Sequence, residues 1–315
     1  MSSSSSPPPP PPPPSSPPVV LKKPVRLACV QLATGPDKRA NLARAAAQVA
    51  AAARRGCGIV VLPECFNSPY GCEHFAAHAE TLQPSPPPEA QAPSFHALRA
   101  MAARHAVYLV GGSVPERCPR TGRLFNTSLT FGPDGALLAA HRKVHLFDID
   151  MPGRIAFRES AVLSPGNKLT LVDLPDYGTI AVAICYDLRF PELAAVAARR
   201  GAFALVYPGA FNLTTGPLHW RLLAQARALD NQIYVALCSP ARDMAAAYHA
   251  WGHSMVVDPM ASVLVEAGEA ETIVEAELRG DAIVEARTQI PLTSQRRFDV
   301  YPDVSAGNVQ FEEPS

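Results

Sequence analysis

The chain has 315 residues, of which 48% are hydrophobic and 18% are charged, and its 28 basic residues balance its 28 acidic ones. Such a high hydrophobic content permits a large buried core, and the length is compatible with one layered α/β domain. The balanced charge gives no reason to expect nucleic-acid binding, and no apolar run reaches the roughly 20 residues that a membrane-spanning helix needs. These properties favour a soluble protein whose partner is a small molecule.

The first 24 residues are expected to form a disordered tail. Residues 1–18 contain only Met, Ser and Pro, including eight consecutive prolines, which favour an extended polyproline II conformation. Because this Ser-rich, acid-free start is followed by Lys22, Lys23 and Arg26, a plastid transit peptide is the alternative. If the tail has no targeting role, seven scattered cysteines without a CxxC pair favour a reducing, cytoplasmic location.

Between residues 25 and 300, short apolar runs alternate with Ala-rich stretches, a pattern typical of a layered α/β domain. Asp37 is a plausible N-cap for the first helix, and the glycines and proline of residues 131–135 favour a hairpin turn. From about residue 291 the periodicity is lost, and residues 301–315 are expected to form a C-terminal extension. The expected strands are 25–32, 58–62, 107–114, 126–131, 136–140, 179–184, 203–207, 233–237 and 254–258, and the expected helices are 38–55, 93–105, 190–200 and 217–230.

Cys185 follows the apolar run 179–184, and Pro191 then begins a helix that Gly201 ends. A strand, a sharp turn and a helix in this order can expose a nucleophile while neighbouring backbone N–H groups point at a developing oxyanion. Buried cysteines also commonly act as small hydrophobic residues. From position alone, an inert core thiol is the stronger interpretation.

Two charged residues end other apolar segments. Glu64 ends the run GIVVLPE, where burial would raise the pKa of its carboxyl group and make it a usable base near neutral pH. Lys143 follows the second hairpin strand in the segment HRKVHLFDID, where its ammonium group could hold an oxyanion. Taken singly, Glu64 is at least as well explained as a solvated charge at a strand end, and Lys143 is better explained as an ordinary surface lysine.

The order of these segments is more informative than any one of them. Glu64 in LPE, Lys143 in HRKVHLF, Glu159 in RES and Cys185 in AICYDLRFPE together resemble the carbon–nitrogen hydrolase, or nitrilase, family. The resemblance covers roughly residues 25–300, and it implies a four-layer α-β-β-α sandwich and a Glu-Lys-Cys triad. The runs 62–71, 143–153, 207–220 and 239–254 resemble an amidase subgroup whose substrates are terminal amides of 2-oxo acids.

The resemblance also implies roles for these residues. Glu64 would be the general base, Lys143 the oxyanion donor, Cys185 the nucleophile, and Glu159 would orient the lysine. The oxyanion would also bind the backbone N–H of Tyr186. Arg189 is the candidate partner for a substrate carboxylate, with a structural salt bridge as an equal alternative. Further pocket candidates are Tyr70, Phe211, Asn212 and Thr215.

No cofactor or metal is expected. Cys72, His74 and His78 suggest a metal cluster, but no fourth ligand of suitable spacing follows. His145, His219, His249 and His253 would permit a Cys-His mechanism, although Glu64 already provides a base. A catalytically silent scaffold and a related amidase acting on deaminated glutathione or N-carbamoyl compounds are the competing hypotheses for function. Family precedent implies a homodimer or a higher homo-oligomer.

Overall fold

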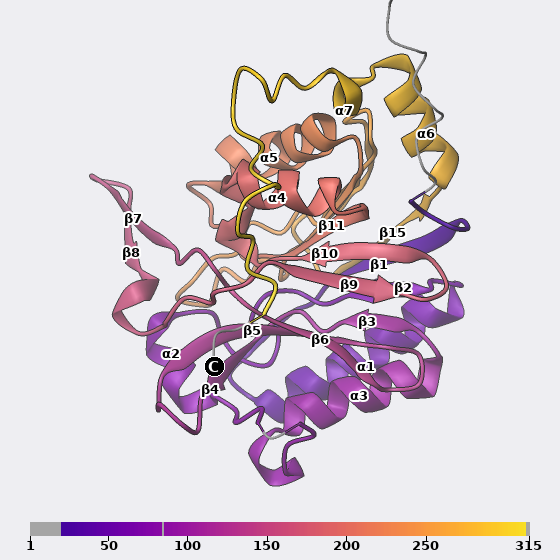
Figure 1. The fold of residues 1–315 in the computed structure, drawn as a ribbon. Helices are drawn as coiled ribbons and strands as arrows, with labels where there is room; N and C mark the ends of the chain where they lie inside the picture. Colours follow the sequence, from indigo (N-terminus) through magenta and orange to yellow (C-terminus); the bar gives the residue numbers. More distant parts are fainter. Residues whose placement is uncertain (1–19, 84, 313–315) are drawn as a thin grey trace, which may run out of the picture.

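The computed structural model describes residues 20–83 and 85–312. Most of the expected N-terminal tail, including any transit peptide, lies outside the described residues. Within the described residues, no helix is long and apolar enough to cross a membrane. Figure 1 shows two β-sheets stacked face to face, with helices on the outer side of each.

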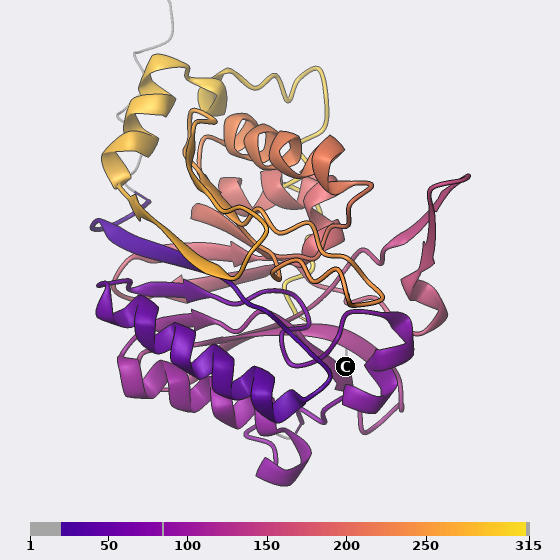
Figure 2. The same cartoon turned by 180° about the vertical axis from the view of Figure 1, so that it is seen from behind.

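The first sheet is built around three neighbouring parallel strands, β1 (Val25–Gln31), β2 (Ile59–Val61) and β3 (Tyr108–Val110). Its strand order is β15-β1-β2-β3-β5-β4, with β6 paired to β5, and the four added strands are antiparallel. Helices α1 (Lys38–Arg54) and α3 (Pro93–His105) cover its outer face, as seen from behind in Figure 2. The remaining strands are β4 (Val114–Arg117), β5 (Leu124–Phe131), β6 (Leu137–Arg142) and β15 (Thr272–Leu278).

The second sheet has the order β14-β13-β12-β11-β10-β9. Its centre is again parallel, with β10 (Gly178–Val182), β11 (Ala202–Pro208) and β12 (Tyr234–Cys238) side by side. Helices α4 (Pro191–Arg199) and α5 (Gly216–Asn231) pack on its outer face. The antiparallel strands are β9 (Thr170–Leu174), β13 (Met255–Val257) and β14 (Val263–Glu266).

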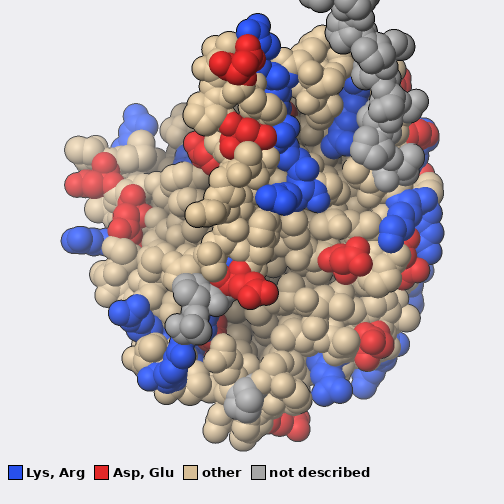
Figure 3. Space-filling view, in the orientation of Figure 1, with Lys and Arg blue, Asp and Glu red and all other residues tan. Residues whose placement is uncertain are grey.

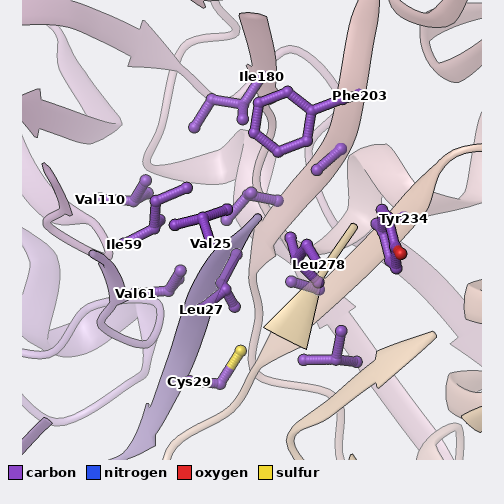
Figure 4. Packing of buried hydrophobic residues seen from close by; sticks show 14 of the residues in the cluster. Val25, Leu27, Cys29, Ile59, Val61, Val110, Ile180, Phe203, Tyr234 and Leu278 are labelled. Atoms are coloured by element: carbon purple, nitrogen blue, oxygen red, sulfur yellow. The ribbon is translucent and has the colours of Figure 1, made fainter. Parts of the chain in front are cut away.

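The alternation of side chains along the central strands produces the four layers. In β1, Leu27 and Cys29 point into the core between the sheets, whereas Ala28 and Val30 point toward α1. Because both faces of such a strand are buried, its central residues, 27–30, form a continuous apolar run without polar alternation. Figure 4 shows the inter-sheet core, to which Ile180 and Phe203 contribute from the second sheet. The expected α-β-β-α sandwich is confirmed.

Most expected elements are present, and the differences lie at the edges of the fold. The N-cap at Asp37 is confirmed, because its side chain accepts hydrogen bonds from the N–H groups of Arg39 and Ala40. A short 3-10 helix, Glu89–Gln91, precedes α3. The expected strand 107–114 is interrupted, because β3 ends at Val110 and β4 begins at Val114. Further elements that the sequence analysis did not predict are β9, β14, β15, α2 (Cys72–His78), α6 (Gly280–Gln289), α7 (Leu292–Gln295) and the hairpin β7–β8 (Asp148–Met151, Ile155–Arg158).

The chain segments next to the two termini pack onto the sandwich. The expected disordered tail over residues 1–24 is wrong at its end, because Leu21 is buried in the inter-sheet core and the backbone N–H of Lys22 bonds to Tyr177. The C-terminal segment wraps over the surface, where Asp303 pairs with Arg199 of α4. On the face seen in Figure 3, basic and acidic side chains are interspersed. That face therefore has no extended field of one sign.

Candidate active site

Cys185 lies at a sharp turn between β10 and α4. Its φ of 47° is in the left-handed region, which a residue with a side chain rarely adopts. Cys185 is also the first residue of a short 3-10 helix, Cys185–Arg189. The turn is held at both ends. The Asp187 side chain accepts the Ile184 N–H, and Arg227 of α5 donates to the carbonyl groups of Leu188 and Arg189. The expected strand-turn-helix arrangement is therefore observed, and its strained conformation has specific support.

Glu64 and Lys143 are fully buried and paired. Glu64 follows β2, and its Oε1 atom lies 2.9 Å from the Nζ atom of Lys143 and accepts a hydrogen bond of 2.9 Å from Asn126. Its Oε2 atom accepts the backbone N–H of Ala210 at 2.9 Å. Neither residue is the solvated surface charge that was the alternative from sequence alone.

Glu159 supplies the second carboxylate for the lysine. Both of its oxygens lie 2.9 Å from the Nζ atom of Lys143. The same carboxylate accepts a 2.7 Å bond from the backbone N–H of Phe147 and a 3.0 Å bond from the hydroxyl of Tyr70. Glu159 is therefore held on several sides and can act as a rigid support for Lys143.

These buried charges shift the pKa values in the group. Burial raises the pKa of Glu64 above the ordinary value, and its attraction to Lys143 only partly opposes this effect. The pKa of Lys143 lies well above its ordinary value, because two neighbouring carboxylates outweigh the effect of burial. The lysine is therefore an ammonium group in the resting protein, and Glu64 is a stronger base than an exposed glutamate.

The Cys185 thiol adjoins this pair. It forms a hydrogen bond with Glu64, and the Ala210 N–H points at its sulfur from 3.4 Å. Burial and the Glu64 carboxylate raise the pKa of the thiol well above its ordinary value. The thiol is therefore protonated at neutral pH, and a carboxylate lies ready to take its proton.

Three of the expected binding residues, Arg189, Tyr186 and Phe211, lie close to one another. The guanidinium of Arg189 lies 5.4 Å from the ring centre of Tyr186 and 4.9 Å from that of Phe211. One of its terminal nitrogens is 3.2 Å from Nδ1 of His219, while its buried Nε atom has no hydrogen-bond partner among the described residues. No described carboxylate forms an ion pair with it. A structural salt bridge thus has no partner in the described part of the chain.

The other three expected residues have local structural contacts. Tyr70 bonds to Glu159 and stacks on Phe157 of β8 with ring centres 5.9 Å apart. The Oδ1 atom of Asn212 accepts hydrogen bonds from the N–H and hydroxyl groups of Thr215, just before α5. Asn212 and Thr215 therefore shape the loop beside Phe211, and the buried Nδ2 atom of Asn212 has no partner within residues 20–83 and 85–312.

The structure adds residues that the sequence analysis did not select. Asn126 holds Glu64 from β5, a strand in which every residue is buried. Tyr248 reaches the site from a distant loop, where its hydroxyl donates to the carbonyl of Ala210. Its ring lies 4.5 Å from that of Tyr70. No local pattern in the sequence indicates this contact, because it joins loops that are far apart in the chain.

Three of the four histidines that were considered as bases, and Cys72, have structural contacts. His145 bonds to Asp187, His219 to Arg189, and His253 pairs with Glu266. The Cys72 thiol points at the carbonyl of Arg158. Across residues 20–83 and 85–312, no group of three or more His, Cys, Asp or Glu side chains is arranged to hold a metal ion.

Comparison with known proteins agrees with the fold. The family model for carbon–nitrogen hydrolases matches residues 26–288. The chain therefore belongs to the carbon–nitrogen hydrolase family, and the expected class of enzyme, a hydrolase of carbon–nitrogen bonds, is confirmed.

Two curated relatives and one solved structure are similar to the chain over most of its length. The omega-amidase NIT3 of Saccharomyces cerevisiae is 52% identical over 289 residues, which are 91% of this chain and 98% of the relative. The omega-amidase NIT2 of Mus musculus is 52% identical over 276 residues, covering 88% and 96% of the two chains. The crystal structure of Saccharomyces cerevisiae Nit3, a member of branch 10 of the nitrilase superfamily, matches with a TM-score of 0.82 at 49% identity, and the match covers 89% of this chain and 98% of that one.

Proposed function

We propose that this protein is an omega-amidase. It would hydrolyse the terminal amides of 2-oxoglutaramate and 2-oxosuccinamate to 2-oxoglutarate and oxaloacetate, with release of ammonia. The observation that carries the proposal is the buried contact of a thiol, a carboxylate and an ammonium group in Cys185, Glu64 and Lys143. The two omega-amidases that are 52% identical to the chain support the choice of substrate.

In the first step, Glu64 accepts the thiol proton while the Cys185 sulfur attacks the carbonyl carbon of the amide. The oxygen of the tetrahedral intermediate becomes negative, and we assign its binding to Lys143 and the backbone N–H of Tyr186. A donor of this kind typically lowers the barrier by about 3 to 4 kcal/mol. Because Glu159 and Glu64 already hold Lys143, little reorganisation accompanies the developing charge.

In the second step, the carbon–nitrogen bond breaks and leaves a thioester on Cys185. Glu64 returns its proton to the leaving nitrogen, so that ammonia departs. A water molecule then gives a proton to Glu64 and attacks the thioester, and the thiol is restored when the carbon–sulfur bond breaks. The carboxylate thus acts alternately as base and acid, and its raised pKa suits both directions of transfer.

Arg189 is the proposed partner of the substrate carboxylate. It is a half-buried cation with no ion-pair partner among the described residues, and it lies four positions after the nucleophile. A planar guanidinium can bind a carboxylate through two parallel hydrogen bonds. Phe211, Tyr186 and Tyr70 would line the space for the carbon chain, with Asn212 and Thr215 shaping the loop beside it.

The decisive experiment compares substrates on the purified full-length protein. Ammonia release is measured from 2-oxoglutaramate, 2-oxosuccinamate and an N-carbamoyl amino acid, and release of the free amine cysteinylglycine is measured from deaminated glutathione, with Cys185→Ala as the blank. We expect the two 2-oxo amides to be the fastest substrates. Fast turnover of deaminated glutathione or of the N-carbamoyl compound beside slow turnover of 2-oxoglutaramate would instead identify a related amidase, which is the second candidate. Undiminished turnover in the Cys185→Ala protein would overturn the cysteine mechanism and favour another class of site.

Assembly into a homodimer or a larger homo-oligomer also stays a prediction. It is supported by an apolar stripe on the outer face of α5, formed by Leu218, Leu222 and Leu229, which are 49%, 63% and 44% exposed. Large exposed apolar side chains at helical spacing are typical of interaction surfaces. Light scattering on the purified protein measures the assembly directly.

A further inference from the structure

Asp187 is a buried carboxylate that the proposed chemistry does not use. It lies two residues after Cys185, and its side chain is fully buried. One of its oxygens accepts the backbone N–H of Ile184 at 2.9 Å, which holds the residue just before the nucleophile. The same oxygen faces Nε2 of His141 at 3.3 Å.

The second oxygen of Asp187 binds a different part of the chain. It accepts the backbone N–H of His145 at 2.8 Å and lies 2.7 Å from the Nδ1 atom of the same residue. Because an ionised carboxylate has no proton to give, the ring nitrogen must be the donor. The His145 ring also stacks on Phe190 at the end of the 3-10 helix, with ring centres 3.6 Å apart. His145 is therefore fixed to the Cys185 turn by two hydrogen bonds and one ring contact.

These contacts connect the two segments that carry the reacting groups. His145 lies two residues after Lys143, whereas Asp187 lies two residues after Cys185, and the paired residues are 42 positions apart in the chain. The ammonium group and the thiol come from different sheets, so no local backbone geometry sets their relative position. Misplacement of a catalytic group by about 1 Å can lower a rate roughly 100-fold.

We propose that Asp187 is a positioning residue whose carboxylate, through His145, holds the Lys143 segment in register with the Cys185 turn. This inference rests on the proposed amidase mechanism, in which Lys143 binds the oxyanion formed when Cys185 attacks. The carboxylate suits this role because one oxygen accepts the Ile184 N–H of the Cys185 turn and the other accepts both donors of His145 in the Lys143 segment. His141, two residues before Lys143, adds a contact to the first oxygen. An amide at the same place has only one acceptor oxygen, so it satisfies the Ile184 side or the His145 side but leaves the other without an acceptor.

The first test replaces Asp187→Asn and compares it with Glu80→Gln. Glu80 is a matched control, because its carboxylate is also buried and accepts hydrogen bonds from Ser94 and Lys38 away from the reacting groups. We expect the Asp187 variant to lose about 100-fold in kcat with little change in KM. The Glu80 variant is expected to melt at a lower temperature with an unchanged kcat. An Asp187 variant with the kcat of the wild type, measured per folded molecule, overturns the inference.

The second test varies the partner and stays informative if the Asp187 variant does not fold. His145→Asn keeps a donor near the position of Nδ1 but loses the ring, whereas His145→Phe keeps a ring that can stack on Phe190 and loses the donor. We expect His145→Phe to lower kcat and His145→Asn to retain most of it. Full activity in His145→Phe would show that the hydrogen bond is dispensable and would reject the inference.

A double-variant cycle shows whether Asp187 and His145 act together on kcat or lower it independently. If Asp187 acts through His145, the protein with both Asp187→Asn and His145→Phe loses no more in kcat than Asp187→Asn alone. Losses that multiply would contradict the connection. The two proposals fail differently: activity in Cys185→Ala removes the proposed mechanism, whereas an inactive Cys185→Ala beside fully active Asp187 and His145 variants removes only the positioning role.

Discussion

The Nζ atom of Lys143 lies 2.9 Å from the Oε1 atom of Glu64, and neither side chain is exposed to solvent. Burying such a pair is costly, since the attraction between the charges often only offsets the loss of hydration. A second carboxylate, Glu159, leaves the buried group with one more negative than positive charge. An arrangement this costly contributes little net stability, which agrees with a role in catalysis.

The variant Lys143→Met tests how much Lys143 contributes to stability and to catalysis. The variant leaves two buried carboxylates without their cation, and removing one partner of a buried pair typically costs about 3 to 5 kcal/mol in the free energy of unfolding. Loss of the oxyanion donor should lower kcat by about 100- to 1,000-fold. Urea unfolding and steady-state kinetics measure the two effects. A variant that retains the wild-type kcat would exclude Lys143 as the oxyanion donor.

The pH dependence of kcat/KM should show the titration of the proposed base, Glu64. The pKa of Glu64 is raised above 4.5, and the carboxyl group is active as a base only when it has lost its proton. The value of kcat/KM should therefore be constant at high pH and fall as the pH is lowered through this raised pKa. Glu64→Gln should remove this limb of the profile and lower kcat by about 100- to 10,000-fold. An unchanged acidic limb in that variant would assign it to another group.

Arg189 should determine the preference for a charged substrate. Arg189→Met is expected to raise KM for 2-oxoglutaramate by roughly 10- to 100-fold, because hydrogen bonds to charged groups contribute about 1.5 to 3 kcal/mol. A neutral amide of the same length, pentanamide, is the matched control and should react similarly with both proteins. Equal losses on the two amides would mean that Arg189 supports the turn and does not bind the carboxylate.

Stability in acid should depend on Asp187. Despite its burial, hydrogen bonds from His141 and His145 lower the pKa of this carboxyl group below its ordinary value. A carboxyl group with a lowered pKa in the folded state stabilises the protein above its unfolded pKa of about 3.9, and this contribution is lost as the pH falls toward the folded value. Urea midpoints should therefore drop below about pH 4 in the wild type, and the drop should be smaller in Asp187→Asn. Equal slopes in the two proteins would contradict this account.

Local patterns in the sequence were sufficient to predict a layered α/β domain, whereas the family resemblance implied the four-layer sandwich. The apolar runs at 25–32, 58–62, 179–184 and 203–207 are continuous because both faces of each strand are buried, and this feature marks central parallel strands. The edge elements lacked such a signal. Strand β15 is only partly buried, and its place beside β1 depends on pairing with a strand more than 200 residues earlier in the chain.

The sequence by itself determined which residues carry the proposed chemistry, because Glu64, Lys143, Glu159 and Cys185 lie in recognisable motifs at strand ends. Position alone favoured an inert core thiol at Cys185, and the order of the other three motifs indicated a nucleophile. The tertiary structure adds geometry that supports the proposed role, because it places a buried carboxylate against the sulfur and an ammonium group against the carboxylate. It also brought in Asn126, Tyr248 and the Asp187–His145 link, whose contacts depend on the packing of distant segments. The local pattern of apolar residues indicates which side chains are buried. The relative position of two catalytic groups depends instead on how separate sheets and loops pack against each other.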